Sequence, residues 1–227
     1  MVQQDHQPMA LVGLKVLDLS RILAGPYATQ LFADLGADVV KVENPDGGDD
    51  TRRWGPPFTS KADGSRGDAA YFSACNRNKR SITVDFASKA GADLLRGLAK
   101  TADIIVENFR PGGLQKYRLD YASIAAINPG IIYCSITGFG QTGPYANRPG
   151  YDFLIQGMGG LMSITGQPDG TPGAGPVKVG VAVCDLFTGL FTANAALAAL
   201  AYRHRTGEGQ HIDLSLIHIS EPTRRTI

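Results

Sequence analysis

Short runs rich in β-branched residues alternate along the chain with segments of helical periodicity, and this alternation is the strongest constraint on the fold. Strands separated by helices of this length pair in parallel, with helices on both faces of one sheet. The chain has 227 residues and 43% hydrophobic content, which is enough to bury such a core. We therefore predict an α/β fold with a doubly wound parallel sheet. The expected strands are residues 15–19, 39–42, 81–86, 104–106, 131–136, 177–183 and 211–216, and the expected helices are residues 24–35, 87–102, 113–127, 152–164 and 186–202.

A lone carboxylate, Asp185, lies where an expected buried strand passes into an expected apolar helix. Valines at alternate positions of residues 177–183 predict the strand, and leucines and phenylalanines from residue 186 onward predict the helix. An unpaired buried carboxylate is costly, so its presence needs a reason. Two compatible interpretations exist. Asp185 caps the helix by accepting from the amide of Phe187 or Thr188, or it is a catalytic group at the sheet edge where α/β proteins bind ligands.

Two short cationic segments lie at the ends of expected strands. Residues 76–80 (NRNKR) come just before the strand at 81–86, and residues 107–112 (ENFRPG) follow the strand at 104–106. Such runs are commonly solvated turns. An arginine at this position can also hold a phosphate in bidentate fashion while an aromatic ring stacks on a base. Because both segments lie at strand edges, we expect the fold to bring them together.

A glycine-rich segment at residues 138–143 (GFGQTG) matches the spacing of a dinucleotide-binding loop after a strand. Pro144 follows at once, so no helix begins there to hold a pyrophosphate. An NAD or FAD site is therefore not favoured. The glycines instead allow close approach of the backbone to a ligand, with amides available to stabilise an oxyanion.

Composition and spacing exclude several other classes of protein. A net charge of +1 offers no broad basic face for nucleic acid. The three cysteines are widely spaced, without a metal-binding pattern, which predicts reduced thiols in a cytoplasmic protein and no metal site. No export signal is recognisable at the amino end. The apolar residues 186–202 fall short of the roughly 20 that cross a bilayer, so no membrane segment is expected.

Several segments, in their order along the chain, carry a likeness to a known family: LDLSRILAGPYATQLFADLGADVVKVENPDGGDDTR, NRNKRSITVDF, ENFRPG, SITGFGQTGPYANRPGYD, GGLMSITG, KVGVAVCDLFTGL and RTGEGQHIDLSL. They resemble the family III CoA-transferases, the CaiB/BaiF family, from about Leu11 to Leu216. The resemblance implies a large domain with a Rossmann-like sheet, a smaller domain, and an interlocked homodimer. It also implies no permanently bound cofactor, with an acyl-CoA thioester and a carboxylic acid acceptor as substrates.

The resemblance assigns a chemical role to Asp185. In the family, the matching aspartate attacks the acyl carbonyl of a CoA thioester. The released CoA thiolate then forms an aspartyl-CoA thioester, which the incoming carboxylate resolves. This route splits one hard displacement into easier covalent steps. By motif position, the residues implied to bind CoA or to surround the reacting groups are Ala24, Gly25, Pro26, Asn76, Arg77, Asn78, Lys79, Arg80, Asn108, Phe109, Arg110, Lys116, Gly138, Gly140, Tyr151 and Asp152.

Two alternative functions stay open at this point. An α-methylacyl-CoA racemase of the same superfamily needs a histidine directly before the residue that matches Asp152, and this chain has Tyr151. A tyrosine ordinarily titrates near pH ~10 and is poorly matched to removing an α-proton at neutral pH, so a transferase is favoured. The other alternative is an inactive CoA-ester-binding fragment. Leu23 stands where formyl-CoA members carry glutamine, which argues against oxalate or formate as the substrate.

The extent of the resemblance also predicts the domain organisation. We expect a disordered tail over residues 1–10, a partial CoA-binding α/β domain over residues 11–216, and a non-native tail over residues 217–227 that resembles translated vector sequence. The family continues well beyond this point. We therefore expect a truncated chain whose sheet is incomplete at its carboxyl end, with apolar faces left uncovered.

Overall fold

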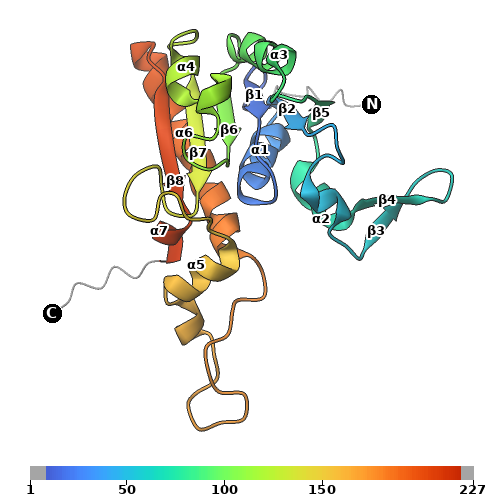
Figure 1. The fold of residues 1–227 in the computed structure, drawn as a ribbon, viewed down its shortest axis with the longest axis vertical. Coiled ribbons are helices and arrows are strands. Elements are labelled where there is room, and N and C mark those ends of the chain that lie inside the picture. The colour runs from blue at the N-terminus through green and yellow to red at the C-terminus, as the bar shows by residue number, and fades with distance from the viewer. Residues whose placement is uncertain (1–8, 221–227) are drawn as a thin grey trace, which may run out of the picture.

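One parallel sheet of six strands forms the centre of the molecule, in the order β5-β2-β1-β6-β7-β8 (Figure 1). The computed structural model describes residues 9–220. All five neighbouring pairs are parallel, which confirms the predicted α/β class. The strands are β1 (Lys15–Asp18), β2 (Asp38–Glu43), β5 (Arg80–Thr83), β6 (Ile104–Glu107), β7 (Ile132–Thr137) and β8 (Gln210–Ser215).

Helices connect the strands, and a small antiparallel hairpin projects to one side beyond α2 (Figure 1). The hairpin comprises β3 (Phe58–Ser60) and β4 (Arg66–Ala69). The α-helices are α1 (Ala24–Asp34), α2 (Ala70–Asn76), α3 (Lys89–Ala99), α4 (Tyr121–Ala125), α5 (Asp152–Met158), α6 (Val183–Thr206) and α7 (Ile217–Ser220). Short 3-10 turns occur at η1 (Asp50–Arg53), η2 (Gln115–Tyr117) and η3 (Leu161–Ile164).

Each face of the sheet has its own apolar core, as the doubly wound prediction requires. Alternate residues of β6 point to opposite faces: Ile104 joins α1 and α6 in one cluster, and Ile105 joins α3 and α4 in the other. Phe32 of α1 is fully buried in the first cluster and Leu95 of α3 in the second. Burial of each such side chain contributes about 1.5–3 kcal/mol. Their combined effect holds the carboxyl ends of the strands in fixed positions.

The expected strand at residues 177–183 does not form. Residues 177–182 run without regular structure, Val183 is already the first residue of α6, and Val177 and Val181 are 46% and 57% exposed. Valine alternation signals a backbone that fits a sheet, but a strand also needs a partner strand to pair with. The neighbour here is η3 instead, because Val177 N–H donates to the Met162 carbonyl. The helix that follows is confirmed and is longer than expected.

Two other expected helices are shorter than the sequence predicted. Residues 113–127 form η2 and α4, separated at Arg118, whose φ of 54° cannot continue a helix. Residues 152–164 form α5 and η3, and Gly160, with φ of 79°, ends the first of them. The glycines that weakened the helix prediction therefore mark the break.

The two expected tails lie mainly outside the described residues, at 1–8 and 221–227. Residues 217–220, expected to have no place in the fold, form α7. Ile217 of that helix packs against the α1–α6 cluster, so these residues are part of the structure described here. The division of the chain at residue 216 otherwise stays a prediction.

Helix α6 is the one helix within residues 9–220 that is long and apolar enough to cross a membrane by length and composition. It packs against α1, β7 and β8, and its residues Ala193, Ala196 and Leu200 are buried in the core. This packing agrees with the expectation of a buried helix. The cytoplasmic location stays a prediction.

Close contact between α1 and α6 depends on Gly189. A Cβ built at Gly189 would lie 2.7 Å from the Ala24 carbonyl oxygen, which is backbone and cannot turn aside. We expect Gly189→Ala to destabilise the protein by about 1–3 kcal/mol through overpacking, measured by urea unfolding. Gly97→Ala on α3 is the matched control, because nothing lies within 4 Å of its Cβ position and alanine there favours the helix. Equal unfolding midpoints for the two variants would contradict the expectation.

Candidate active site

A cavity of about 470 Å³ opens at the carboxyl ends of the central strands, where parallel α/β sheets place their ligands. Its walls come from the turn after β1 (residues 21–24), the segment after β6 (108–113), the end of β7 (136–138) and residues 148–151. Asp185 contributes from the first turn of α6. The carboxylate therefore faces the same space as segments that lie far from it in sequence.

Asp185 is not the cap of its own helix, contrary to one of the two interpretations. The helix begins at Val183 with Ala182 as its N-cap, and Asp185 is half-buried in the first turn. Burial, and next the negative charge of Asp152, raise the pKa of Asp185 to about 7. A substantial fraction of this carboxyl is therefore protonated at neutral pH.

Asp152 takes the capping position instead. Its Oδ1 accepts from the backbone N–H of Cys184 at 2.7 Å and of Asp185 at 3.3 Å. Asp152 itself begins α5, is 8% exposed and does not line the cavity. The sequence pattern had placed it among the ligand contacts, but its carboxylate is directed at the backbone of α6.

Three arginines line the cavity with Asp185: Arg21, Arg110 and Arg148. Arg21 pairs with Asp50 at 3.2 Å, and both groups are exposed. Arg148 lies 4.8 Å from the centre of the Tyr145 ring. Arg110 forms no ion pair within residues 9–220 and is available for an anion.

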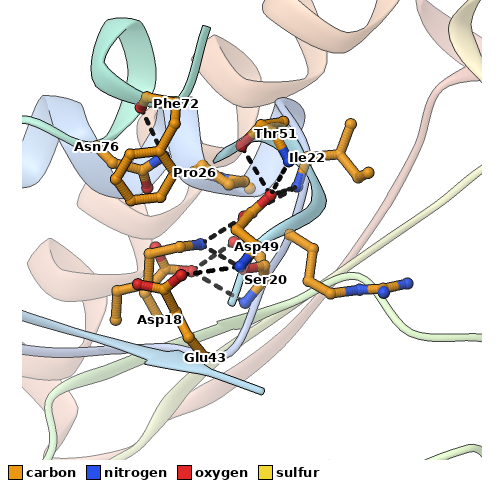
Figure 2. Close-up of polar contacts among 12 residues, drawn as sticks. Asp18, Ser20, Ile22, Pro26, Glu43, Asp49, Thr51, Phe72 and Asn76 are labelled. Atoms are coloured by element: carbon orange, nitrogen blue, oxygen red, sulfur yellow. Dashed lines mark hydrogen bonds and ion pairs between the residues drawn. The ribbon is translucent and has the colours of Figure 1, made fainter. Parts of the chain in front are cut away.

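The turn that carries Arg21 is strained. Ile22 has φ of 72°, a left-handed conformation that is costly for a β-branched residue and persists only where neighbours impose it. Asn108 holds the turn through two hydrogen bonds to Arg21: its Oδ1 accepts from Arg21 N–H at 2.9 Å, and its Nδ2 donates to the Arg21 carbonyl at 2.7 Å. Asp49 holds the next residue by accepting from Ile22 N–H at 3.3 Å (Figure 2).

Buried charges lie behind this turn. Lys41 pairs with Asp49 at 2.9 Å and donates to the Ser20 carbonyl at 2.9 Å, while Lys79 pairs with Asp18 at 3.0 Å. Figure 2 shows where Asp18, Ser20 and Asp49 lie. All four side chains are at most 2% exposed. Burial alone would raise the pKa of Asp18, but the two lysines and neighbouring hydroxyls outweigh it and lower the pKa to about 2. The network therefore keeps Asp18 ionised and anchors the cavity wall.

A second cavity, of about 480 Å³, adjoins the first and shares Arg21 and Phe109 with it. It lies at the ends of β1, β2 and β5. The Phe86 ring packs edge-on against Phe109 and Tyr117, with ring centres 5.5 Å and 5.3 Å apart. Arg53 and several carboxylates complete the wall.

Some of the predicted site residues lie together and others do not. Those that line the first cavity are Ala24, Asn108, Phe109, Arg110, Gly138, Tyr151 and Asp185. Those that line neither of these two cavities are Gly25, Pro26, Asn76, Arg77, Asn78, Lys79, Arg80, Lys116, Gly140 and Asp152. Lys116 nevertheless lies 4.7 Å from the ring of Tyr117, which lines the second cavity.

No hydrogen bond or ion pair joins residues 76–80 to residues 107–112 in the described part of the chain, so the expectation that they come together stays a prediction. The first segment leads into β5 and the second follows β6, and β2 and β1 lie between these two strands in the sheet. Arg77 pairs with Asp34 at the end of α1, and Arg80 pairs with Asp38 at the start of β2. Lys79 is committed to the buried Asp18. Any contact of this segment with a ligand stays a prediction.

Sequence reasoning missed the cavity residues Arg21, Ile22 and Arg148 and the supporting pair Lys41 and Asp49. Arg21 and Ile22 directly follow an expected strand, and that position was a usable signal. Lys41 offered only a charge inside an apolar strand. No metal-binding cluster of three or more candidate side chains occurs within residues 9–220.

Comparison with known proteins places the chain in a family. The family model described as "CoA-transferase family III" matches residues 11–222. A succinate–glutarate CoA-transferase of Agrobacterium fabrum is 55% identical, with the match covering 96% of this chain and 54% of that protein. A mouse succinyl-CoA:glutarate CoA-transferase is 50% identical, with 95% and 47% covered.

Solved structures give the same answer for the fold. The crystal structure of a CaiB/BaiF family protein from Brucella suis superposes with a TM-score of 0.89 at 59% identity, and the match covers 94% of this chain and 55% of that one. The chain spans about half the length of the curated relatives it matches. It belongs to CoA-transferase family III.

Proposed function

We propose that the protein moves CoA from an acyl-CoA thioester to a free carboxylic acid through a covalent intermediate on Asp185. The observation that carries the proposal is a half-buried carboxylate with a pKa near 7 facing a cavity that also holds Arg110. A carboxylate with a raised pKa is a stronger nucleophile than an ordinary one, yet a useful fraction stays ionised at neutral pH.

Four displacements complete the exchange. Asp185 Oδ attacks the thioester carbonyl carbon, the carbon–sulfur bond breaks, and CoA thiolate and a mixed anhydride result. The thiolate then attacks the Asp185 carbonyl, releasing the donor carboxylate and leaving an aspartyl-CoA thioester. The acceptor carboxylate attacks this thioester, giving a second anhydride and CoA thiolate. Attack of the thiolate on the acceptor's acyl carbon yields the new acyl-CoA and regenerates Asp185.

Each step develops negative charge on a carbonyl oxygen, and the cavity walls supply groups to stabilise it. Gly138 lines the cavity with its backbone, whereas the Gly140 amide already donates to Thr137 Oγ1 at 2.8 Å. Gly138 is therefore better placed than Gly140 for the oxyanion role expected of these glycines. Arg110 is the cation placed to hold the free carboxylate of a dicarboxylic acid.

The two adjoining cavities support a path for CoA. The acyl end would occupy the cavity that holds Asp185, and the nucleotide end would extend past Arg21 and Phe109 into the second. The aromatic cluster of Phe86, Phe109 and Tyr117 suits a purine ring, and Arg53 suits a phosphate. This placement moves the proposed nucleotide contacts away from residues 76–80.

A pH-resolved trapping experiment tests the proposal. The protein is incubated with succinyl-CoA, the donor that the names of its relatives suggest, and the CoA adduct is quantified by intact mass spectrometry and mapped after hydroxylamine cleavage. Because only the ionised carboxylate attacks, adduct formation should rise with pH and pass its midpoint near 7. Absence of an adduct at Asp185 at every pH would refute the proposal for this chain. Incorporation of solvent deuterium at the α-carbon of a 2-methylacyl-CoA would favour the racemase alternative instead.

We also propose that the active form is a homodimer in which apolar side chains of α6 are covered. Phe187 and Phe191 are 47% and 52% exposed, although they lie in the helix that carries Asp185. Exposure of large aromatic side chains beside an active site marks a surface that another segment or subunit covers. Light scattering on the purified protein gives the mass of the particle directly.

A further inference from the structure

The carboxylate of Asp152 caps the amino end of α6. The first N–H groups of any α-helix lack acceptors within the helix. In α6, Asp152 Oδ1 accepts from two of them, Cys184 N–H at 2.7 Å and Asp185 N–H at 3.3 Å. A buried charge satisfied in this way fixes where the helix starts relative to α5.

Gln156, one turn further along α5, fixes the other oxygen. Its Nε2 donates to Asp152 Oδ2 at 2.6 Å, and its Oε1 accepts from Val179 N–H at 2.8 Å. Gln156 is fully buried, and these two bonds fix the orientation of its amide. Asp152 and Gln156 together join α5, the segment before α6, and the start of α6 into one rigid unit.

This arrangement leaves the Asp185 carboxyl free. An aspartate in the first turn of a helix commonly turns back to the free amides of that turn. Here Asp152 occupies those donors, and the Asp185 carboxyl accepts no hydrogen bond within residues 9–220. A nucleophile without a hydrogen-bond partner keeps its full electron density for attack.

The charges around Asp185 agree with this picture. Burial comes first and Asp152 second among the causes that raise its pKa to about 7. Burial raises the pKa of Tyr71 in α2 and of Cys184 in α6, and the negative charge of Asp185 adds to the rise in each. The arginines at 21, 110 and 148 line the same cavity.

We propose that Asp152, held by Gln156, is the positioning residue of Asp185: it binds the amino end of α6 and keeps the Asp185 carboxylate unbonded and directed into the cavity. The inference rests on the proposed function of Asp185 as nucleophile. It also replaces the earlier expectation that Asp152 contacts the ligand.

The test removes the charge of Asp152 and keeps its acceptor. In Asp152→Asn the side-chain carbonyl can still bind the α6 amides, but the new amide nitrogen replaces Oδ2 and cannot accept from Gln156. A change in Asp185 therefore reports the loss of the charge together with the loss of this bond. The carbon-13 carboxyl resonance of Asp185, assigned by its loss in Asp185→Asn, is followed against pH. We expect the titration midpoint of the Asp185 carboxyl to lie near pH 7 in the native protein. In Asp152→Asn the midpoint should fall toward the ordinary range of a carboxyl group. The pH midpoint of adduct formation should move by the same amount.

Asp169→Asn is the matched control, because Asp169 is an exposed carboxylate in the loop between η3 and α6. It should leave the Asp185 midpoint unchanged. An unchanged midpoint in Asp152→Asn would overturn the inference even if adduct formation persists. Absence of an adduct in the native protein would defeat the proposed function, while the resonance would still test the coupling of the two carboxylates.

A second variant covers the case in which Asp152→Asn does not fold. Gln156→Met keeps the volume of the side chain and removes the donor to Asp152. The Asp152 carboxylate then keeps its charge but is held less firmly against the amino end of α6. We expect adduct formation to slow by roughly tenfold, with the KM for acyl-CoA unchanged, because misplacing a reacting group lowers the rate of the chemical step. A native rate in Gln156→Met would count against the positioning role.

Discussion

Replacing Asp185 with alanine should abolish CoA exchange, lowering the rate by roughly 10³-fold or more, while acyl-CoA still binds. The reason is that Asp185 is the one carboxylate among residues 9–220 that lines the 470 Å³ cavity, so no covalent intermediate can form in the variant. Exchange is measured by transfer of labelled CoA from succinyl-CoA to glutarate, and binding by calorimetry. A variant that exchanges CoA at the native rate would exclude Asp185 as the nucleophile.

Two further variants separate chemistry from structure in this experiment. Asp185→Asn keeps the shape of the side chain and should be equally inactive, since an amide is a poor nucleophile. Asp169→Ala removes an exposed carboxylate outside the cavity and should exchange CoA at the native rate. If acyl-CoA binding is lost together with exchange in both Asp185 variants, the carboxylate serves binding instead of catalysis.

Replacing Lys79 with methionine should destabilise the protein by about 3–5 kcal/mol, because it leaves Asp18 buried without its partner. The two side chains are 2% and 0% exposed and lie 3.0 Å apart. Lys41 and nearby hydroxyls would still face Asp18, but the ion pair would be lost. Urea unfolding followed by circular dichroism measures the change.

An exposed ion pair on the same segment provides the control. Arg80 and Asp38 are 69% and 48% exposed, so Arg80→Met should cost only about 0–1 kcal/mol. The double variant Asp18→Leu with Lys79→Met removes both charges of this pair and should recover part of the lost stability, less the cost of leaving Ser20 without its acceptor. Equal effects of Lys79→Met and Arg80→Met would show that burial adds nothing to the pair.

The same network predicts how stability responds to acid. The pKa of Asp18 is about 2 in the folded protein, below its ordinary value of 3.8. The folded state therefore gains stability from the ionised carboxylate above pH about 4. This contribution is lost as the pH falls through about 2.

The sequence was most informative where a local pattern and its tertiary environment agree. The strands that became β1, β2, β6 and β7 were predicted because their aliphatic residues fill both faces of a covered sheet. The sequence singles out Asp185 because a carboxylate interrupts an apolar segment. The cavity that Asp185 lines supports its interpretation as a catalytic group. Both features can be recognised from residues that are close in sequence, or from neighbours that are all apolar.

Features that depend on distant partners were not predictable. Lys41 is buried because Asp49, which follows its strand in a loop, pairs with it. The strained turn is held by Asn108 at Arg21 and by Asp49 at Ile22, and these two residues lie far apart in sequence. Likewise, nothing local revealed that Asp152 rather than Asp185 binds the start of α6. Valine alternation at residues 177–183 misled for the same reason, since no strand lies beside it.

The contact between α1 and α6 at Gly189 limits how the shape of the candidate site can change. Ala24 lines the cavity, and its carbonyl oxygen leaves no room for even a Cβ atom at Gly189 of the helix that carries Asp185, so the two helices pack closely on this side of the cavity. A larger or smaller acid cannot be accommodated by moving these two helices apart without loss of the core between them. If the proposed function holds, we expect changes in substrate range to arise at residues 109–113 and 148–151, which line the cavity and do not form the hydrogen bonds that hold the turn at Arg21.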